Sequence, residues 1–209
     1  MLLGTTYAWF TDSVSSEGNT IQSGTLKVDL SHKVGDRWIS LKETADHKVF
    51  DYAHWEPGYT RVETLKVENL GTLALQYKLS LSVAPDSETL GDNGENLADV
   101  IHVYYTNTEA TPANFAEIKD TWTDAGTLAD VMNSPATFIG GRLTPYGEQG
   151  DEQLLTIALH MDENAGNEYQ NLSIGVDGFA VELIATQATF EEDAFDTNYD
   201  ENVPDPAVP

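Results

Sequence analysis

The feature that most constrains the fold is a strict alternation of apolar and polar residues in "LALQYKLSLSVA". Every second residue from Leu73 to Val83 is apolar, and most residues between them are polar or small. A period of two places all the apolar side chains on one face of an extended strand, whereas a helix would scatter them around its axis. This stretch therefore predicts a β-strand with one buried face, which needs a second layer to cover it.

Shorter patterns of the same kind recur along the chain, with turn signals between them. They predict strands at residues 24–31, 36–41, 47–52, 60–70, 73–84, 100–107, 152–162 and 172–190. Pro57 and Gly58 stand in the order that a type II turn favours, and residues 69–72 form a compact turn between two strands. Strands in this number predict an all-β antiparallel sandwich, and the spacing alone leaves both immunoglobulin-like and jelly-roll topologies open.

One long segment departs from the strand pattern. Residues 107–149 contain Pro, Gly and short amphipathic pieces, and we expect an insertion with short helices near residues 113–119 and 126–133. The sandwich is assigned to residues 23–190. Residues 191–209 form an acidic, Pro-rich tail with few apolar residues, as is typical of a mobile linker.

The charge of the chain excludes several classes of partner. Ten Lys and Arg stand against 35 Asp and Glu, which gives a formal net charge of -25. Such a chain repels nucleic acid and anionic membrane surfaces, so neither is expected as a partner. No cysteine is present, so disulfides and thiolate metal sites are excluded.

Three stretches resemble the TasA/camelysin family of exported proteins. The first is "TYAWFTD" followed by "SGTLKVDL", in which residues 7–10 match the small and aromatic end of a signal peptide. The second is "WEPGYTRVETLKVENLGTLALQYKLSL", and the third is "EYQNLSIGVDGFAVELIATQ". The second stretch matches the family's turns at Pro57, Gly58, Asn69, Gly71, Leu73 and Ala74.

The resemblance implies a jelly-roll-like sandwich, export to the cell surface or the extracellular space, and assembly into fibres of a biofilm matrix. It also implies donor-strand complementation, in which an N-terminal segment of one subunit completes a sheet of the next. The expected partner is therefore a second copy of the chain in a head-to-tail polymer, with accessory matrix proteins as further partners. No membrane is expected as a partner of the mature form.

The apolar start of the chain, within residues 1–22, has two interpretations. It is either the remnant of a signal peptide, with the mature chain starting near Trp9, or a retained donor strand followed by the flexible tether "SVSSEGN". We predict the donor strand, because both faces of the segment are apolar and suit a strand that is covered on both sides. Its residues are Leu2, Leu3, Gly4, Thr6, Tyr7, Ala8, Trp9 and Phe10.

The alternative function is that of a secreted metalloprotease, as camelysin-like relatives have been classed. The five histidines are His32, His47, His54, His102 and His160. They form no H-E-x-x-H motif, and no two of them are four residues apart, so we predict no catalytic residue, no metal site and no enzymatic activity. No cofactor is expected, although acidic loops at residues 92–96, 162–168 and 196–202 offer oxygen ligands that suit calcium.

A third function is carbohydrate binding at the cell surface. Aromatic side chains could line a binding face, although such residues more often fill a core or a subunit contact. The candidates are Trp38, Trp55, Trp122, Tyr104 and Tyr105.

Overall fold

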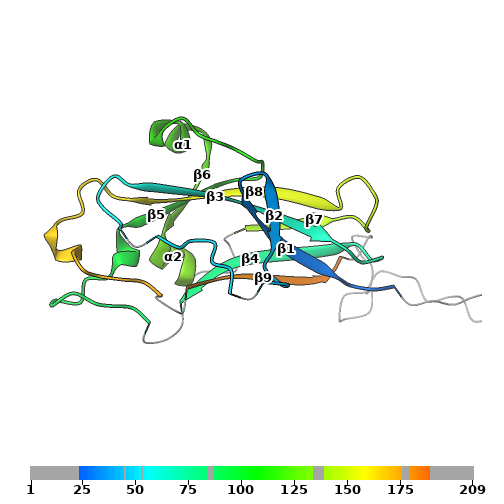
Figure 1. Cartoon of the computed structure of the whole chain (residues 1–209), viewed down its shortest axis with the longest axis horizontal. Helices are drawn as coiled ribbons and strands as arrows, with labels where there is room; N and C mark the ends of the chain where they lie inside the picture. The colour runs from blue at the N-terminus through cyan, green and yellow to red at the C-terminus, as the bar shows by residue number, and fades with distance from the viewer. Residues whose placement is uncertain are drawn as a thin grey trace, which may run out of the picture.

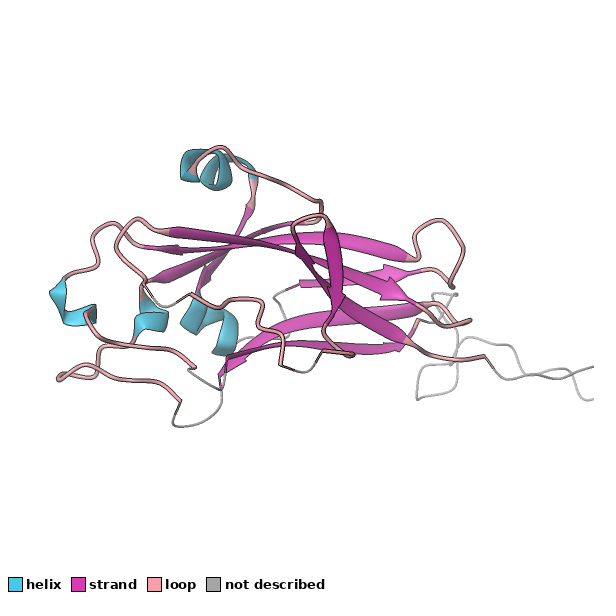
Figure 2. Cartoon of the chain, viewed as in Figure 1, coloured by secondary structure: helices cyan, strands magenta, loops and turns pink. Residues whose placement is uncertain are grey.

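The chain forms two antiparallel β-sheets packed face to face (Figures 1 and 2). The computed structural model describes residues 24–44, 46–52, 54–83, 87–133, 139–175 and 179–188. Within them, strands dominate and the helices are few and short, so the predicted all-β antiparallel sandwich is confirmed.

The two sheets differ in width. Among the described residues, the larger sheet has six strands in the order β2-β1-β3-β8-β5-β6, and the smaller has three in the order β7-β4-β9. The larger sheet contains β1 (Val28–Val34), β2 (Arg37–Ser40), β3 (Thr60–Asn69), β5 (Ile101–Thr106), β6 (Thr123–Thr127) and β8 (Glu152–Met161). The smaller sheet contains β4 (Leu75–Val83), β7 (Ile139–Leu143) and β9 (Phe179–Gln187).

The main core lies between the sheets and follows the period-two pattern. On β4, the side chains of Leu75, Leu79 and Leu81 are fully buried. They belong to the same cluster as Leu65 of β3 and Leu155 of β8, which are also fully buried. Alternation along these strands therefore places one apolar face of each in the shared core.

The two helices occur where short helices were expected. They are α1 (Phe115–Thr121) and α2 (Leu128–Asn133). Figure 1 shows α1 on the outer side of the larger sheet. Its residue Ile118 packs there with Tyr104 and Ala158. In α2, Leu128 and Val131 enter the main core, so the two helices cover different faces.

Three stretches differ from the sequence prediction. Residues 107–149 also contain β6 and β7, which are edge strands with few apolar residues and therefore carry little periodic signal. The strand predicted at residues 47–52 is wrong. Its described residues form no strand, and Val49 is buried in the core as a single side chain. The last strand begins at Phe179 rather than near residue 172.

A buried asparagine fixes the corner between β3 and β4. The Asn69 side chain is fully buried, and its Nδ2 donates hydrogen bonds to the carbonyl oxygens of Leu73 (2.8 Å) and Thr144 (2.7 Å). Its Oδ1 accepts a hydrogen bond from the backbone N–H of Gly71 at 2.9 Å. A Cβ atom on Gly71 would lie 2.3 Å from the carbonyl oxygen of Thr25, so only glycine lets these backbones approach.

We predict that Asn69→Ala lowers the free energy of unfolding by about 2–4 kcal/mol, because it leaves buried backbone groups at this corner without partners. Urea unfolding measures the change. Asn164→Ala is the matched control, since Asn164 is exposed and bonds only to Asp162 nearby, and it should cost no more than about 0.5 kcal/mol. Equal effects of the two substitutions would contradict a structural role for the corner.

Candidate functional site

The predicted donor strand lies outside the described residues and stays a prediction. This applies to Leu2, Leu3, Gly4, Thr6, Tyr7, Ala8, Trp9 and Phe10. Three features of the described residues bear on function: a buried polar network, a pair of histidines on the outer face of the larger sheet, and an open edge of the smaller sheet.

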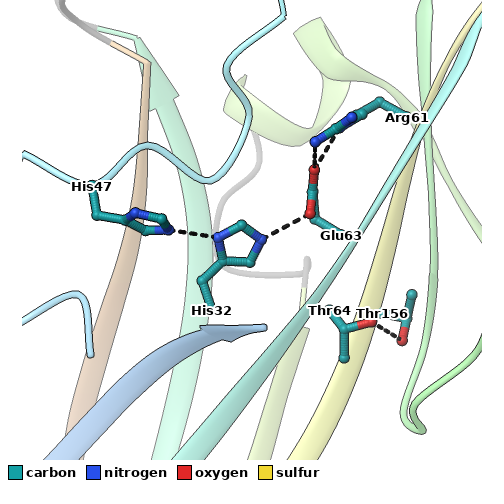
Figure 3. A network of polar contacts seen from close by, with 6 residues as sticks. All are labelled: His32, His47, Arg61, Glu63, Thr64 and Thr156. Carbon is teal, nitrogen blue, oxygen red and sulfur yellow. Dashed lines mark hydrogen bonds and ion pairs between the residues drawn. The ribbon is translucent and has the colours of Figure 1, made fainter. Parts of the chain in front are cut away.

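The buried polar network joins β1, β3 and the segment between β2 and β3 (Figure 3). His32 of β1 and Glu63 of β3 are 4% and 7% exposed, and their side chains meet with 2.8 Å between His32 Nε2 and Glu63 Oε2. On its other side, His32 Nδ1 lies 2.7 Å from His47 Nε2. The guanidinium of Arg61 pairs with the second oxygen of Glu63.

When both histidines are neutral, the hydrogen bonds determine which ring nitrogen of each carries the proton. An ionised Glu63 only accepts hydrogen bonds, so His32 donates to it from Nε2. The Nδ1 of neutral His32 is then an acceptor, and His47 donates to it from Nε2. Burial lowers the pKa of Arg61, but the charge and hydrogen bond of Glu63 outweigh this and hold the pKa above its ordinary value. The network thus forms a continuous chain from a charged pair to His47.

Two further histidines lie side by side on the outer face of the larger sheet. His102 of β5 is the register partner of His160 of β8. His160 is buried, its Nδ1 lies 2.7 Å from Thr60 Oγ1, and its ring stacks on Phe115 with 3.4 Å between centroids. Burial, as the largest influence, lowers the pKa of His160. The buried Nδ1 of His102 has no hydrogen-bond partner among the described residues.

These histidines do not assemble a metal centre. Both ring nitrogens of His32 are engaged, His160 bonds Thr60 and is covered by Phe115, and His54 is exposed elsewhere. In the part of the chain that the structure describes, no group of three or more His, Asp or Glu side chains is arranged to hold a metal ion.

The acidic loops proposed for calcium bond to their own neighbours. In the loop at residues 162–168, Asp162 Oδ1 accepts hydrogen bonds from the backbone and side-chain nitrogens of Asn164. In the loop at residues 92–96, hydrogen bonds from Asn93 lower the pKa of Glu95. The third loop, at residues 196–202, lies outside the described residues.

The aromatic residues proposed for carbohydrate binding do not share one face. Trp38 lies beneath the ammonium groups of Lys33 and Lys66. Trp55 packs edge-on against Tyr59. Tyr104 and Trp122 belong to the cluster under α1. Tyr105 packs against the main core instead.

The open edge of the smaller sheet is the feature that the sequence analysis did not single out. Strand β9 pairs in unbroken antiparallel register with β4, and no described strand pairs with its other side. The N–H of Ala188 donates to the carbonyl of Ala74, which continues this register by one pair. Because backbone groups of antiparallel strands alternate in direction, the N–H groups of Val181, Leu183 and Ala185 point away from β4, toward the open side.

The side chains beside this open edge remain incompletely covered. Val181, Leu183 and Ala185 of β9 face the main core but are only partly buried, whereas Leu79 and Leu81 of the adjacent β4 are fully buried. A strand added beside β9 would therefore gain backbone hydrogen bonds and would bury apolar surface at the same time.

Fold and edge together define an antiparallel β-sandwich protein whose smaller sheet ends in a long edge strand, unpaired within the described residues. The chain belongs to the family described as camelysin metallo-endopeptidase, whose family model matches residues 1–192. The resemblance to the TasA/camelysin family is thereby confirmed, and with it membership of a family of secreted or surface proteins. A search among curated proteins gave no significant match.

The family description implies a metal ion, but the described residues do not fit one. The ring nitrogens of His32 are bonded to His47 and Glu63, and Nδ1 of His160 lies against Thr60. Nδ1 of His102 has no hydrogen-bond partner among the described residues, but these residues offer no three-ligand group around it. No described helix is long and apolar enough to cross a membrane.

We predict that the stability lost in His160→Asn depends on pH. Because the folded state lowers the pKa of His160, the folded chain binds this proton more weakly than the unfolded chain. The contribution of the neutral ring is complete above the ordinary histidine pKa of about 6.5 and decreases as the pH falls below it. The difference in unfolding free energy between parent and variant should therefore shrink from about pH 7.5 to about pH 5. His54→Asn removes an imidazole at an exposed position and is the control for the substitution itself. A difference in unfolding free energy between the parent and His160→Asn that grows as the pH falls would contradict this prediction.

We also predict that the purified chain holds no stoichiometric zinc and shows no chelator-sensitive hydrolysis of casein. Metal analysis and a protease assay measure this. Stoichiometric zinc, with activity lost in His102→Ala or His160→Ala, would place the chain among metalloproteases instead.

Proposed function

We propose that the chain is an exported structural subunit that polymerises into extracellular filaments. In this proposal, the N-terminal segment of one copy adds a strand to β9 of the next copy. The observation that carries the proposal is the open β9 edge, whose apolar side chains are only partly buried. Enzymatic activity has no part in it.

Among the described sheet edges, β9 is the least protected against strand addition. Edges are commonly protected by short strands, bulges and charges. β2 has only four residues, β7 has five, and β6 pairs with β5 through a register shift. In contrast, β9 has nine residues in regular register, and its outward-facing Ile184 is 62% exposed.

The sequence of the N-terminal segment suits this edge. Residues 1–10 contain no charged side chain in a chain of net charge -25, whereas residues 191–209 are strongly acidic. A neutral segment that is apolar on both faces can be buried without desolvating a charge. The contact joins different surfaces of two copies, so it does not close on itself and propagates as a filament.

The first described residues of the chain are held in place. The backbone N–H groups of Thr72 and Leu73 donate to the carbonyl of Thr25, and the N–H of Thr25 bonds Thr72 Oγ1. The chain is therefore attached to the turn after Asn69 at Thr25, six residues after the end of the proposed tether.

We predict that deletion of residues 1–14 leaves a folded, soluble monomer that forms no fibres, because the described sandwich begins after this segment. Negative-stain electron microscopy and size-exclusion chromatography measure the outcome. A synthetic peptide of residues 1–14 should bind the truncated monomer, and a peptide of the same composition in scrambled order is the control. Normal fibre formation by the truncated chain would rule out the N-terminal segment as donor.

We predict that Ala185→Pro abolishes fibres while the monomer stays folded. The N–H of Ala185 points to the open side of β9, so proline removes a donor that the monomer does not use for pairing with β4. Ala185→Val is the matched control, since valine keeps the N–H and favours strands, and it should assemble as the parent does. The proposal for β9 fails if the proline variant folds and polymerises at the parent rate.

A further inference from the structure

We propose that the segment from Asp46 to Tyr52, called the flap below, stays closed while His32 and His47 share at most one added proton, and that it opens when both rings are protonated. The flap lies between β2 and β3 and contributes the buried side chain of Val49 to the main core. Its closure is a property of the monomer and does not depend on the proposed function.

Few contacts hold the middle of the described flap. Val49 is buried in the core, and Phe50 meets Phe179, the first residue of β9, edge-on with 5.9 Å between ring centroids. The polar contact is the hydrogen bond from His47 to His32, two residues before Val49. Because this bond is partly buried, its loss leaves ring nitrogens without partners and destabilises the closed flap.

Counting protons shows when the bond survives. With both rings neutral, His47 donates from Nε2 to His32 Nδ1. With one added proton on His32, its Nδ1 becomes a donor, and His47 can accept at Nε2 in its other neutral tautomer. With two added protons, both facing nitrogens carry hydrogen across 2.7 Å, so the bond is lost and two like charges oppose each other.

The charged groups around His32 and His47 do not compensate the positive charge that a second added proton would bring. Glu63 is the only carboxylate bonded to the described network, and the guanidinium of Arg61 already pairs with it. The strand register places Arg37 of β2 on the same face as His32, where it is exposed. Asp46 and Lys48 flank His47 and are exposed to water, which screens them.

The remaining charges of β1 lie on the other side of the sheet. Asp29 and Lys33 are an odd number of residues from His32, so their side chains project from the opposite face. The doubly protonated pair is therefore an uncompensated positive site in a partly buried position, and release of His47 to solvent relieves it.

Opening of the flap would uncover Val49 and Phe50 beside the beginning of β9. Phe50 covers Phe179 in the closed state, so release would widen the accessible edge at this end of the strand. An effect on assembly would follow only if strand addition to β9 is correct, so this consequence rests on the proposed function.

The experiment uses the absence of cysteine from the chain. In Val49→Cys, the new thiol is unique and nearly the same size as the side chain it replaces, so its reaction with 4,4′-dithiodipyridine reports opening of the flap. Rates for the dilute full-length chain are divided by those of the urea-unfolded chain at each pH, which removes the titration of the thiol itself. We expect labelling at least about tenfold faster at about pH 5 than at about pH 7.5, because the loss of one hydrogen bond changes an equilibrium by about this factor.

Two variants separate this mechanism from a general effect of acid. His47→Gln keeps a donor near the position of Nε2 but does not titrate, so the acceleration should disappear. His54→Gln alters an exposed histidine two residues beyond the flap and should retain the acceleration. An acceleration that is absent from the parent, or unchanged in His47→Gln, overturns the proposal.

Hydrogen exchange on the chain without the cysteine provides the second measurement, should Val49→Cys fail to fold. The amides of Val49 and Phe50 should lose protection in acid, after correction for intrinsic exchange, while those of Leu155 and Ile157 in β8 keep theirs. Equal loss at both places means unfolding of the whole domain and also overturns the proposal. Neither measurement involves assembly. A negative result would therefore overturn flap opening alone, while the deletion and proline variants test strand addition to β9 separately.

Discussion

Two sheets of unequal width must enclose one apolar core, and the rest of the structure depends on this constraint. The smaller sheet has three strands and the larger has six, so strands alone do not cover the inner face of the larger sheet. The helix α2 supplies Leu128 and Val131, and the flap supplies Val49, to the same core cluster. Beside β9 the cover is incomplete, because Leu183 and its neighbours stay partly exposed. The flap and the open edge are therefore consequences of the same mismatch.

Much of the sandwich could be predicted because period-two alternation is a local signal. The burial of Leu75, Leu79 and Leu81 follows from it directly. β6 and β7 lie in the stretch that was assigned to an insertion, because five residues each are too few to show a clear alternation. The strand predicted at 47–52 was wrong, because its buried residue Val49 lies in a segment whose described backbone forms no strand. The polar network joins residues far apart in sequence, so no spacing indicates it. One signal was available: Glu63 and Asn69 stand in phase with Leu65 and Val67 of β3, and a polar residue on a buried face needs a partner.

The histidines illustrate why a family description and a set of residues can differ. The chain belongs to a family described as metallo-endopeptidases, yet His32, His47 and His160 are engaged in hydrogen bonds and packing within the protein. A fold supports many functions, so function must be argued from the site itself. Here the edge of β9 is the site with the clearest unsatisfied chemistry: backbone donors without strand partners among the described residues, next to apolar side chains that remain partly exposed.

The most direct test of this account is a helical reconstruction of the filaments by cryo-electron microscopy, at a resolution that traces the backbone. The account predicts a fourth strand beside β9 in the smaller sheet, continuous with the N-terminal segment of the neighbouring subunit and carrying Trp9 or Phe10 against the partly exposed side chains of β9. A filament in which β9 has no added strand, or in which the added strand belongs to the same subunit, would contradict it.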